Sequence, residues 1–234
     1  MGFDVRRRLS VADTVTLANA VVGFAAGAVA YTDLQLAARL MLLAIILDAV
    51  DGIVAREGDS SAVGPLLDSI TDVISFGATP SLFLFVALTG AYGSVGEASP
   101  VVVVGITLLA AVYAVFSVVR TAFYTTYIEG VDARPGIPNT LGVIILATAY
   151  LSGITNPLVL AAGAVVLSLL MVAPFDFPKP GARTAIPMGA VLSISVVAPT
   201  ALGRLGPRVM LVVALLFLTL GPRYYWEGTE ASGE

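Results

Sequence analysis

The stretch Asp48-Ala-Val-Asp51-Gly-Ile-Val-Ala-Arg56, followed after a short link by Gly64-Pro-Leu-Leu-Asp68-Ser-Ile-Thr-Asp72, places four aspartates at the ends of two apolar segments of membrane length. An ionised carboxylate in such a segment is costly unless it is paired or binds a metal. Carboxylates this close also repel one another. Divalent cations relieve both costs, and magnesium or manganese bound by oxygen ligands readily shares its coordination with phosphates. The stretch therefore predicts a metal and phosphate site at a membrane surface.

The composition is that of an integral membrane protein. Of the 234 residues, 58% are hydrophobic and 12% are charged, whereas a soluble domain carries about 25% charged residues. The chain has no cysteine and no histidine. Disulfides, thiolate or imidazole metal sites and nucleophilic catalysis by cysteine or by a serine–histidine pair are therefore excluded.

The charge balance is acidic. The formal net charge is −4, and one lysine stands against eleven arginines. This balance argues against nucleic acid as a partner. It suits a surface exposed to high salt, as in a halophilic source, although a GC-rich genome would also favour arginine over lysine.

Eight apolar segments approach the length of a membrane-spanning helix. They predict an all-α, polytopic membrane bundle, with a short fifth span and a seventh span interrupted by Pro187 and Pro199. The expected spans lie near Thr14–Tyr31, Leu36–Val54, Leu66–Leu88, Val101–Tyr124, Leu141–Leu151, Leu158–Pro174, Ala185–Leu202 and Val209–Leu220.

Loop arginines and the lysine predict the orientation. With both termini in the cytosol, nine of these residues face the cytosol and three face outward, as the positive-inside rule requires. We therefore expect a multi-pass protein of the cell membrane with the aspartate cluster on its cytosolic side.

Helical spacing predicts how the aspartates face one another. Asp48 and Asp51 are three residues apart, and Asp68 and Asp72 are four apart, so each pair shares one face of its helix. The short link makes the two helices antiparallel neighbours. The two pairs can then face each other across a gap that suits one or two cations.

Small residues and one arginine frame the aspartates. Gly52, Ala55 and Gly64 leave room for a bulky group to approach the backbone. Arg56 offers a planar pair of donors suited to phosphate.

These residues resemble the signature of the CDP-alcohol phosphatidyltransferases, which reads Asp-x-x-Asp-Gly-x-x-Ala-Arg, a spacer, then Gly-x-x-x-Asp-x-x-x-Asp. The chain departs from the pattern only in its spacer, which has seven residues where the family usually has eight or more. All eight signature residues are present: Asp48, Asp51, Gly52, Ala55, Arg56, Gly64, Asp68 and Asp72.

The resemblance implies a six-helix core with two divalent cations, Mn2+ or Mg2+, bound by the four aspartates. Asp72 would also be the catalytic base. Such an enzyme transfers the phosphatidyl-type group of a CDP-linked lipid to an alcohol and releases CMP. Gly52, Ala55, Arg56 and Gly64 would line the pocket for the CDP-lipid. We assign residues 1–180 to this membrane domain, and residues 181–234 to two additional transmembrane helices and a short cytosolic tail.

Segments beyond the signature are similar to the phosphatidylserine synthases of bacteria and archaea. They are Thr16–Phe24, Asp72–Pro80, Gly136–Gly142 and Met171–Lys179. This resemblance implies L-serine as the acceptor and CDP-archaeol or CDP-diacylglycerol as the lipid. The chain departs from this branch after the fourth span, where it reads Arg120-Thr-Ala-Phe-Tyr124 instead of the frequent Ala-Arg-Phe-Asn.

Three residues are candidates for the acceptor pocket, each with a simpler alternative. Arg120 could hold the acceptor carboxylate, or its side chain could extend to the lipid headgroups. Arg134 could pair with a phosphate or be a solvated loop charge. Ser75 could orient the acceptor, or its hydroxyl could bond to the helix backbone.

Other functions stay open on sequence alone. Glycerol phosphate and inositol phosphate are alternative acceptors, but each brings a phosphate that needs further basic residues. A transporter with intramembrane carboxylates predicts inverted repeats or broken helices, and a prenyltransferase would place two Asp-rich motifs far apart. The oligomeric state is open, with a homodimer as one possibility.

Overall fold

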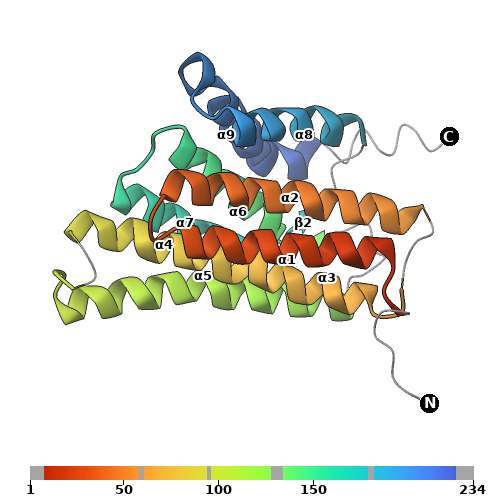
Figure 1. The fold of residues 1–234 in the computed structure, drawn as a ribbon, viewed down its shortest axis with the longest axis horizontal. Helices are drawn as coiled ribbons and strands as arrows, with labels where there is room; N and C mark the ends of the chain where they lie inside the picture. Colours follow the sequence, from red (N-terminus) through yellow and green to blue (C-terminus); the bar gives the residue numbers. More distant parts are fainter. Residues whose placement is uncertain (1–7, 58–60, 94–95, 128–133, 179–181, 225–234) are drawn as a thin grey trace.

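A computed structural model describes residues 8–57, 61–93, 96–127, 134–178 and 182–224, which form a bundle of helices (Figure 1). The expected all-α membrane fold is confirmed. In chain order the elements are α1 (Val11–Val29), α2 (Leu34–Arg56), α3 (Gly64–Asp72), the π-helix η2 (Val73–Ala78), α4 (Thr79–Thr89), the 3-10 turn η3 (Gly90–Tyr92), α5 (Pro100–Tyr127), β1 (Arg134–Pro135), α6 (Asn139–Leu151), α7 (Pro157–Met171), β2 (Asp176–Phe177), α8 (Ala182–Val197) and α9 (Ala201–Tyr224).

Each of the eight expected spans corresponds to helix within these described ranges. Four stretches are long and apolar enough to cross a membrane, namely Val11–Val29, Gly64–Tyr92, Pro100–Tyr127 and Ala201–Arg223. Helix α2 has 23 residues, or roughly 34 Å at 1.5 Å per residue, which also reaches across a hydrocarbon core of about 30 Å. Helices α6, α7 and α8 are shorter, with 13, 15 and 16 residues.

Local capping fixes where the first two helices begin. Ser10 and Asp13 form a capping box, in which the Ser10 amide donates to the Asp13 carboxylate at 2.8 Å and the Asp13 amide donates to the Ser10 hydroxyl at 3.1 Å. Asp33 caps α2 by accepting from the Leu36 amide at 2.9 Å. Both helices therefore start at sites where a side chain satisfies amides that the helix itself cannot.

Small residues let α1 and α2 pack closely along their length (Figure 1). Ala26 of α1, Ala30 at its C-terminal end, and Ala37, Ala38 and Ala44 of α2 are all buried. Lipid tails are as apolar as leucine, so helices in a membrane associate largely through such close van der Waals contact. This pair of helices carries the first half of the aspartate signature.

The third span is one long helix with a wider π turn in its middle. The π segment follows Asp72 directly, and the Thr79 amide donates to the carbonyl of Ile74, five residues earlier. Pro80 cannot donate to the Phe76 carbonyl, four residues earlier, because it has no N–H. The Ser117 hydroxyl of α5 donates to that carbonyl at 3.4 Å.

Side-chain hydroxyls also tie this segment to α1. Ser75 donates to the Asn19 carbonyl at 3.3 Å, and Thr79 lies 2.9 Å from the Gly23 carbonyl. The backbones come so close that a Cβ on Gly23 would lie 2.9 Å from the Ser75 Cα. A glycine is therefore required at this crossing.

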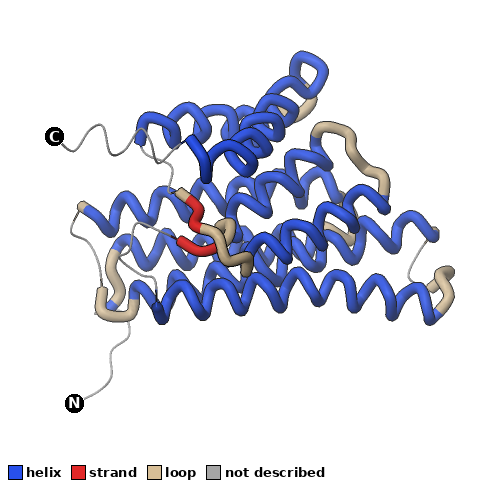
Figure 2. Tube along the Cα trace, turned by 180° about the vertical axis from the view of Figure 1, so that it is seen from behind, coloured by secondary structure: helices blue, strands red, loops and turns tan. Residues whose placement is uncertain are grey.

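Several boundaries differ from those expected. The sixth span ends at Met171 rather than Pro174, and the chain continues into β2, which pairs antiparallel with β1 (Figure 2). The seventh ends at Val197, two residues before Pro199, and the Arg39 Nε of α2 donates to the Val196 carbonyl at 2.6 Å. We expected the seventh span to end at Leu202 and the eighth to begin at Val209. Residues 202–204 instead lie within α9, where their left-handed φ angles of 48°, 66° and 68° interrupt the start of the helix.

The last two helices cover one side of the bundle, with α8 against α2 and α9 against α6 (Figure 1). The division of the chain at residue 180 stays a prediction.

Gly23→Ala is expected to destabilise the protein, because the added methyl would overlap the Ser75 backbone and hydroxyl. Overpacking of this kind costs about 1–3 kcal/mol, more than the gain of up to about 1 kcal/mol in helix propensity. The thermal unfolding midpoint of the purified protein in detergent should fall. Gly163→Ala in α7 is the control, since a Cβ there would meet nothing within 4 Å. Equal midpoints for both variants would contradict the close crossing.

Candidate active site

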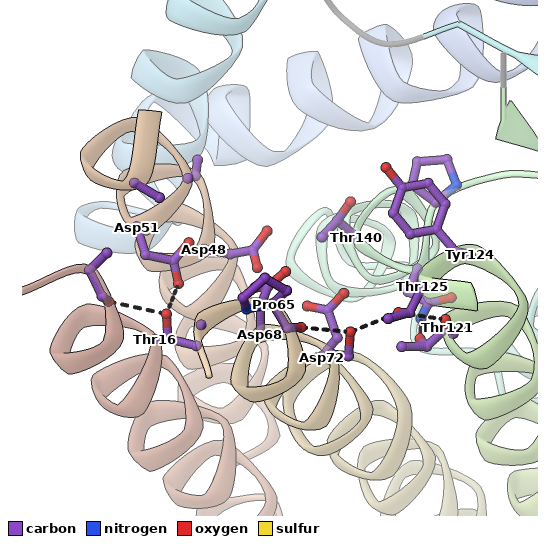
Figure 3. A pocket seen from close by; sticks show the side chains of 18 of the residues that line it. Thr16, Asp48, Asp51, Pro65, Asp68, Asp72, Thr121, Tyr124, Thr125 and Thr140 are labelled. Atoms are coloured by element: carbon purple, nitrogen blue, oxygen red, sulfur yellow. Dashed lines mark hydrogen bonds between the residues drawn. The ribbon is translucent and has the colours of Figure 1, made fainter. Parts of the chain in front are cut away.

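A cavity of about 600 Å³ opens between α1, α2, α3, α5 and α6 at the end of the bundle that carries the aspartates (Figure 3). All eight signature residues line it. Met188 of α8 and Phe217 of α9 add apolar side chains to its wall. The additional C-terminal helices thus contribute to the cavity.

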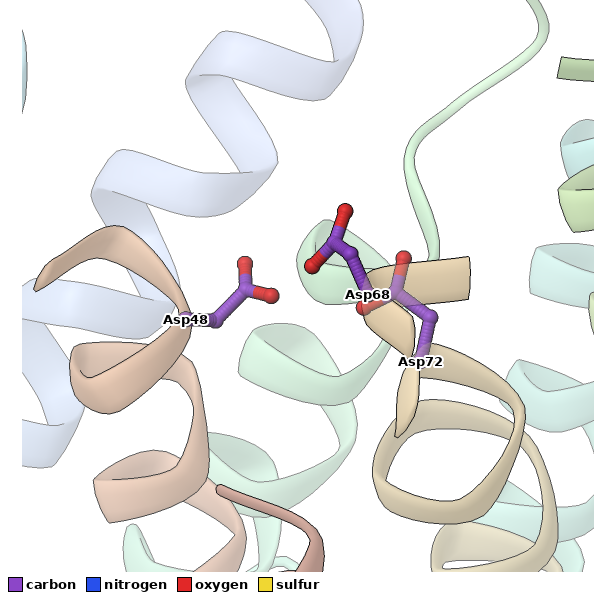
Figure 4. A group of neighbouring side chains, drawn as sticks. All are labelled: Asp48, Asp68 and Asp72. Atoms are coloured by element: carbon purple, nitrogen blue, oxygen red, sulfur yellow. The ribbon is translucent and has the colours of Figure 1, made fainter. Parts of the chain in front are cut away.

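Three of the aspartates form one group. Asp48 on α2 faces Asp68 and Asp72 on α3 (Figure 4), and one oxygen from each carboxylate lies within 4.8 Å of the others. The Oδ1 atom of Asp72 is buried and has no hydrogen-bond partner in the described part of the chain. Converging hard oxygen donors, one of them buried and unsatisfied, fit a divalent cation such as Mg2+ or Mn2+. The predicted facing of α2 and α3 is therefore found, and the group is able to hold a metal.

Asp51 lies beside this group but interacts with α1. Its side chain is 5% exposed, and its Oδ2 lies 2.7 Å from the Thr16 hydroxyl (Figure 3). The same hydroxyl is 3.1 Å from the Ala12 carbonyl. Thr16 thereby orients Asp51, whose role as a metal ligand stays a prediction.

The two signature glycines meet different surroundings. A Cβ on Gly52 would find only the Arg56 guanidinium, at 3.5 Å, so the space beside Gly52 is open to the cavity. A Cβ on Gly64 would lie 3.2 Å from a carboxylate oxygen of Asp13. Gly64 thus makes room for an acidic side chain of α1, a neighbour that the sequence did not suggest.

Arg120 lines the cavity from α5 and is 8% exposed. Its guanidinium carbon lies 5.0 Å from the ring centroid of Tyr124, a cation–π arrangement. It is also close enough to Asp72 to interact with it electrostatically. This position favours a role inside the cavity over extension to the headgroups.

The other two acceptor candidates are placed less favourably. Ser75 is buried outside the cavity, and its hydroxyl donates to the Asn19 carbonyl. The structure thus supports the simpler alternative, a bond to the backbone, although to that of α1 rather than of its own helix. Arg134 takes part in the backbone pairing of β1 with Phe177, and its side chain lies outside the described part of the structure.

Sequence reasoning missed several residues of the cavity. Asp13 and Thr16 come from α1, and Thr121, Asn139 and Thr140 come from α5 and α6. The Ser10-x-x-Asp13 capping pattern and the Thr16–Phe24 resemblance were signals for the first two. Asn139 and Thr140 fall within the Gly136–Gly142 resemblance, and Thr121 falls within the Arg120–Tyr124 stretch, but neither pattern assigned these three residues to the site.

Comparison with known proteins agrees with this geometry. The chain matches the CDP-alcohol phosphatidyltransferase family over residues 9–174. It is 27% identical over 185 residues to archaetidylserine synthase of Methanothermobacter thermautotrophicus, covering 76% of this chain and 74% of the relative. It is 28% identical over 179 residues to CDP-diacylglycerol–serine O-phosphatidyltransferase of Methanocaldococcus jannaschii, covering 76% and 78%. A Bacillus subtilis protein of that same name is 28% identical over 169 residues, covering 70% and 87%.

The chain belongs to the CDP-alcohol phosphatidyltransferase family, because the match extends over more than half of its length. It is therefore an enzyme of this class, and the transporter and prenyltransferase alternatives are set aside.

Asp68→Asn is expected to weaken metal binding, because it removes one charge from the three-carboxylate group. We expect Mn2+ affinity, measured by the electron paramagnetic resonance of free Mn2+, to fall at least about tenfold. CMP release should fall about a hundredfold or more, and EDTA should abolish it in the native protein. Asp176→Asn, an exposed carboxylate on β2, is the control. Unaltered Mn2+ binding in Asp68→Asn would rule out this metal site.

Proposed function

We propose that the enzyme transfers the phosphatidyl-type group of a CDP-linked lipid to the hydroxyl of L-serine and releases CMP. The observation that carries this proposal is the likeness to relatives named for serine transfer over about three quarters of the chain. The lipid is CDP-archaeol or CDP-diacylglycerol. Both tails are plain hydrocarbon, and the apolar side chains of Ile144, Met188 and Phe217 at the cavity suit either one.

Asp48, Asp51, Asp68 and Asp72 would hold two divalent cations, Mg2+ or Mn2+. When bound, the cations would supply positive charge against the diphosphate and against the charge that develops on the departing CMP. Gly52 and Ala55 leave the cavity open on this side. Arg56 lies next to Gly52 and would donate to the diphosphate.

The acceptor would meet the lipid phosphate near Asp72. The serine hydroxyl oxygen forms a bond to the phosphorus that bears the lipid, while the bond from that phosphorus to the oxygen of CMP breaks. Asp72 takes the hydroxyl proton as general base. Arg120, which interacts with Asp72 from α5, would hold the serine carboxylate and so orient the hydroxyl.

The charges that line the cavity favour serine over phosphorylated acceptors. Among the described residues the cationic side chains at its wall are Arg56 and Arg120. If Arg56 binds the diphosphate, Arg120 is the one guanidinium at the wall that can bind the acceptor. One guanidinium can neutralise the carboxylate of serine. Glycerol phosphate or inositol phosphate would add a multiply charged phosphate to the diphosphate already in the site, and would need further cationic groups.

The first test is an acceptor screen with purified protein, CDP-lipid and Mn2+. Serine should support CMP release, and glycerol phosphate and inositol phosphate should not. Arg120→Lys keeps the charge but loses the planar pair of donors, so it should raise the KM for serine more than the KM for CDP-lipid. Arg120→Ala should raise it by roughly tenfold or more, the loss of a charged hydrogen bond.

Two results of this screen would count against the assignment. Turnover of glycerol phosphate or inositol phosphate in place of serine would change the proposed acceptor. If both Arg120 variants have the native KM for serine, Arg120 does not bind the acceptor. The proposed reaction would still stand.

We further propose that the active site faces the cytosol, on the basis of the excess of arginine and lysine in the loops on that side. The chain has no native cysteine, so single cysteines report on topology directly. Ala62→Cys, in the link before α3, should be protected from an impermeant thiol reagent in intact cells. Ser99→Cys, just before α5, should be labelled, and both should react after permeabilisation. The reverse pattern would invert the orientation.

A further inference from the structure

Asn139, the first residue of α6, has an unusual place in the cavity. It lines the cavity and yet is only 1% exposed. It follows Pro138, whose extended backbone precedes the helix. Its side chain is thus held at the wall rather than free in solvent.

Hydrogen bonds to α5 fix which way the amide of Asn139 points. Its Nδ2 donates to the Thr121 hydroxyl at 2.8 Å and lies 3.4 Å from the Ser117 carbonyl. A carbonyl only accepts, so the NH2 group must be the one that faces α5. The amide oxygen is then directed away from these two partners.

That oxygen is buried and has no hydrogen-bond partner in the ranges that the structure describes. A buried acceptor without a donor costs about 1–3 kcal/mol, and most such groups in folded proteins are satisfied. At the wall of a binding cavity, a ligand that carries N–H donors would satisfy it. The free oxygen is therefore a second observation, beside the cavity itself, that points to a ligand.

The neighbourhood indicates which ligand group this is. Thr121, which binds the Asn139 amide, directly follows Arg120 on α5, and all three residues line the cavity. One cation and one neutral acceptor thus line the same cavity from α5 and α6. An α-amino acid carries the matching pair, a carboxylate and an ammonium on one carbon.

We propose that the amide oxygen of Asn139 accepts a hydrogen bond from the ammonium group of the acceptor and so determines specificity for an amino acid. This inference rests on the proposed function, in which the acceptor is serine. Arg120 binds the carboxylate of serine, Asn139 binds its ammonium group, and its hydroxyl faces Asp72. Acceptors without an amino group leave the oxygen unsatisfied and are selected against.

The test compares serine with two molecules that each lack one of its groups. Ethanolamine has the ammonium but no carboxylate, and 3-hydroxypropionate has the carboxylate but no ammonium. Both are measured as competitors of serine in CMP release with CDP-lipid and Mn2+.

Asn139→Leu removes the acceptor oxygen and keeps a side chain of similar size. It should raise the serine KM and the ethanolamine inhibition constant about tenfold or more, with the 3-hydroxypropionate constant and the CDP-lipid KM within twofold of the native values.

Asn139→Asp keeps an oxygen acceptor and serves as the conservative variant. The serine KM should stay within about threefold of the native value, while 3-hydroxypropionate, an anion, should inhibit at least about tenfold more weakly. This prediction holds by itself if Asn139→Leu does not fold, which the thermal unfolding midpoint reports.

Equal effects on serine and 3-hydroxypropionate in the variants would overturn the inference and show that Asn139 only joins α6 to α5. A native enzyme that uses no amine-bearing acceptor would instead overturn the proposed function, so the two failures are distinguishable. An unaltered serine KM in Asn139→Leu, with serine turned over by the native enzyme, would refute the inference alone.

Discussion

Repulsion among carboxylates is the constraint on which the rest of this structure depends. Asp48, Asp68 and Asp72 bring three acidic oxygens within 4.8 Å of one another at the end of a largely apolar bundle. Like charges at such distances oppose the approach of α2 and α3. The helices must therefore be held together elsewhere, by contacts that do not involve the acids. A divalent cation held by this group would relieve the repulsion, and its binding would then be coupled to the stability of the site.

The contacts that hold the helices lie deeper in the bundle. Alanines between α1 and α2 fix one side of the cavity. The π segment after Asp72 fixes the other. The hydroxyls of Ser75 and Thr79 donate to carbonyls of α1, and the Ser117 hydroxyl of α5 donates to a carbonyl of the π segment. A π turn shifts the side chains that follow it relative to a regular helix. The half of the helix with Asp68 and Asp72 can thus face the cavity while Phe76 is fully buried in the core.

The sequence predicted what depends on local spacing. The helical spans, the shared faces of the aspartates and their approach across a short link follow from residues near one another in the chain. It could not predict what depends on distant segments. The bond between Thr16 and Asp51 joins residues 35 apart, and the orientation of Asn139 is set by α5. The break at Leu202 in α9 involves backbone angles that no motif indicated.

The signature aspartates gather on one side of the cavity, and this arrangement has a chemical consequence. The four signature aspartates line it from α2 and α3, whereas Arg120 and Asn139 line it from α5 and α6. In the proposed reaction, a cation-bound diphosphate would lie on the acidic side and the serine zwitterion on the other. Apolar side chains of α8 and α9 complete the wall, beside helices that reach into the lipid. Asp72 lines the cavity beside Arg120, so in the proposed reaction the lipid phosphate and the serine hydroxyl would meet there.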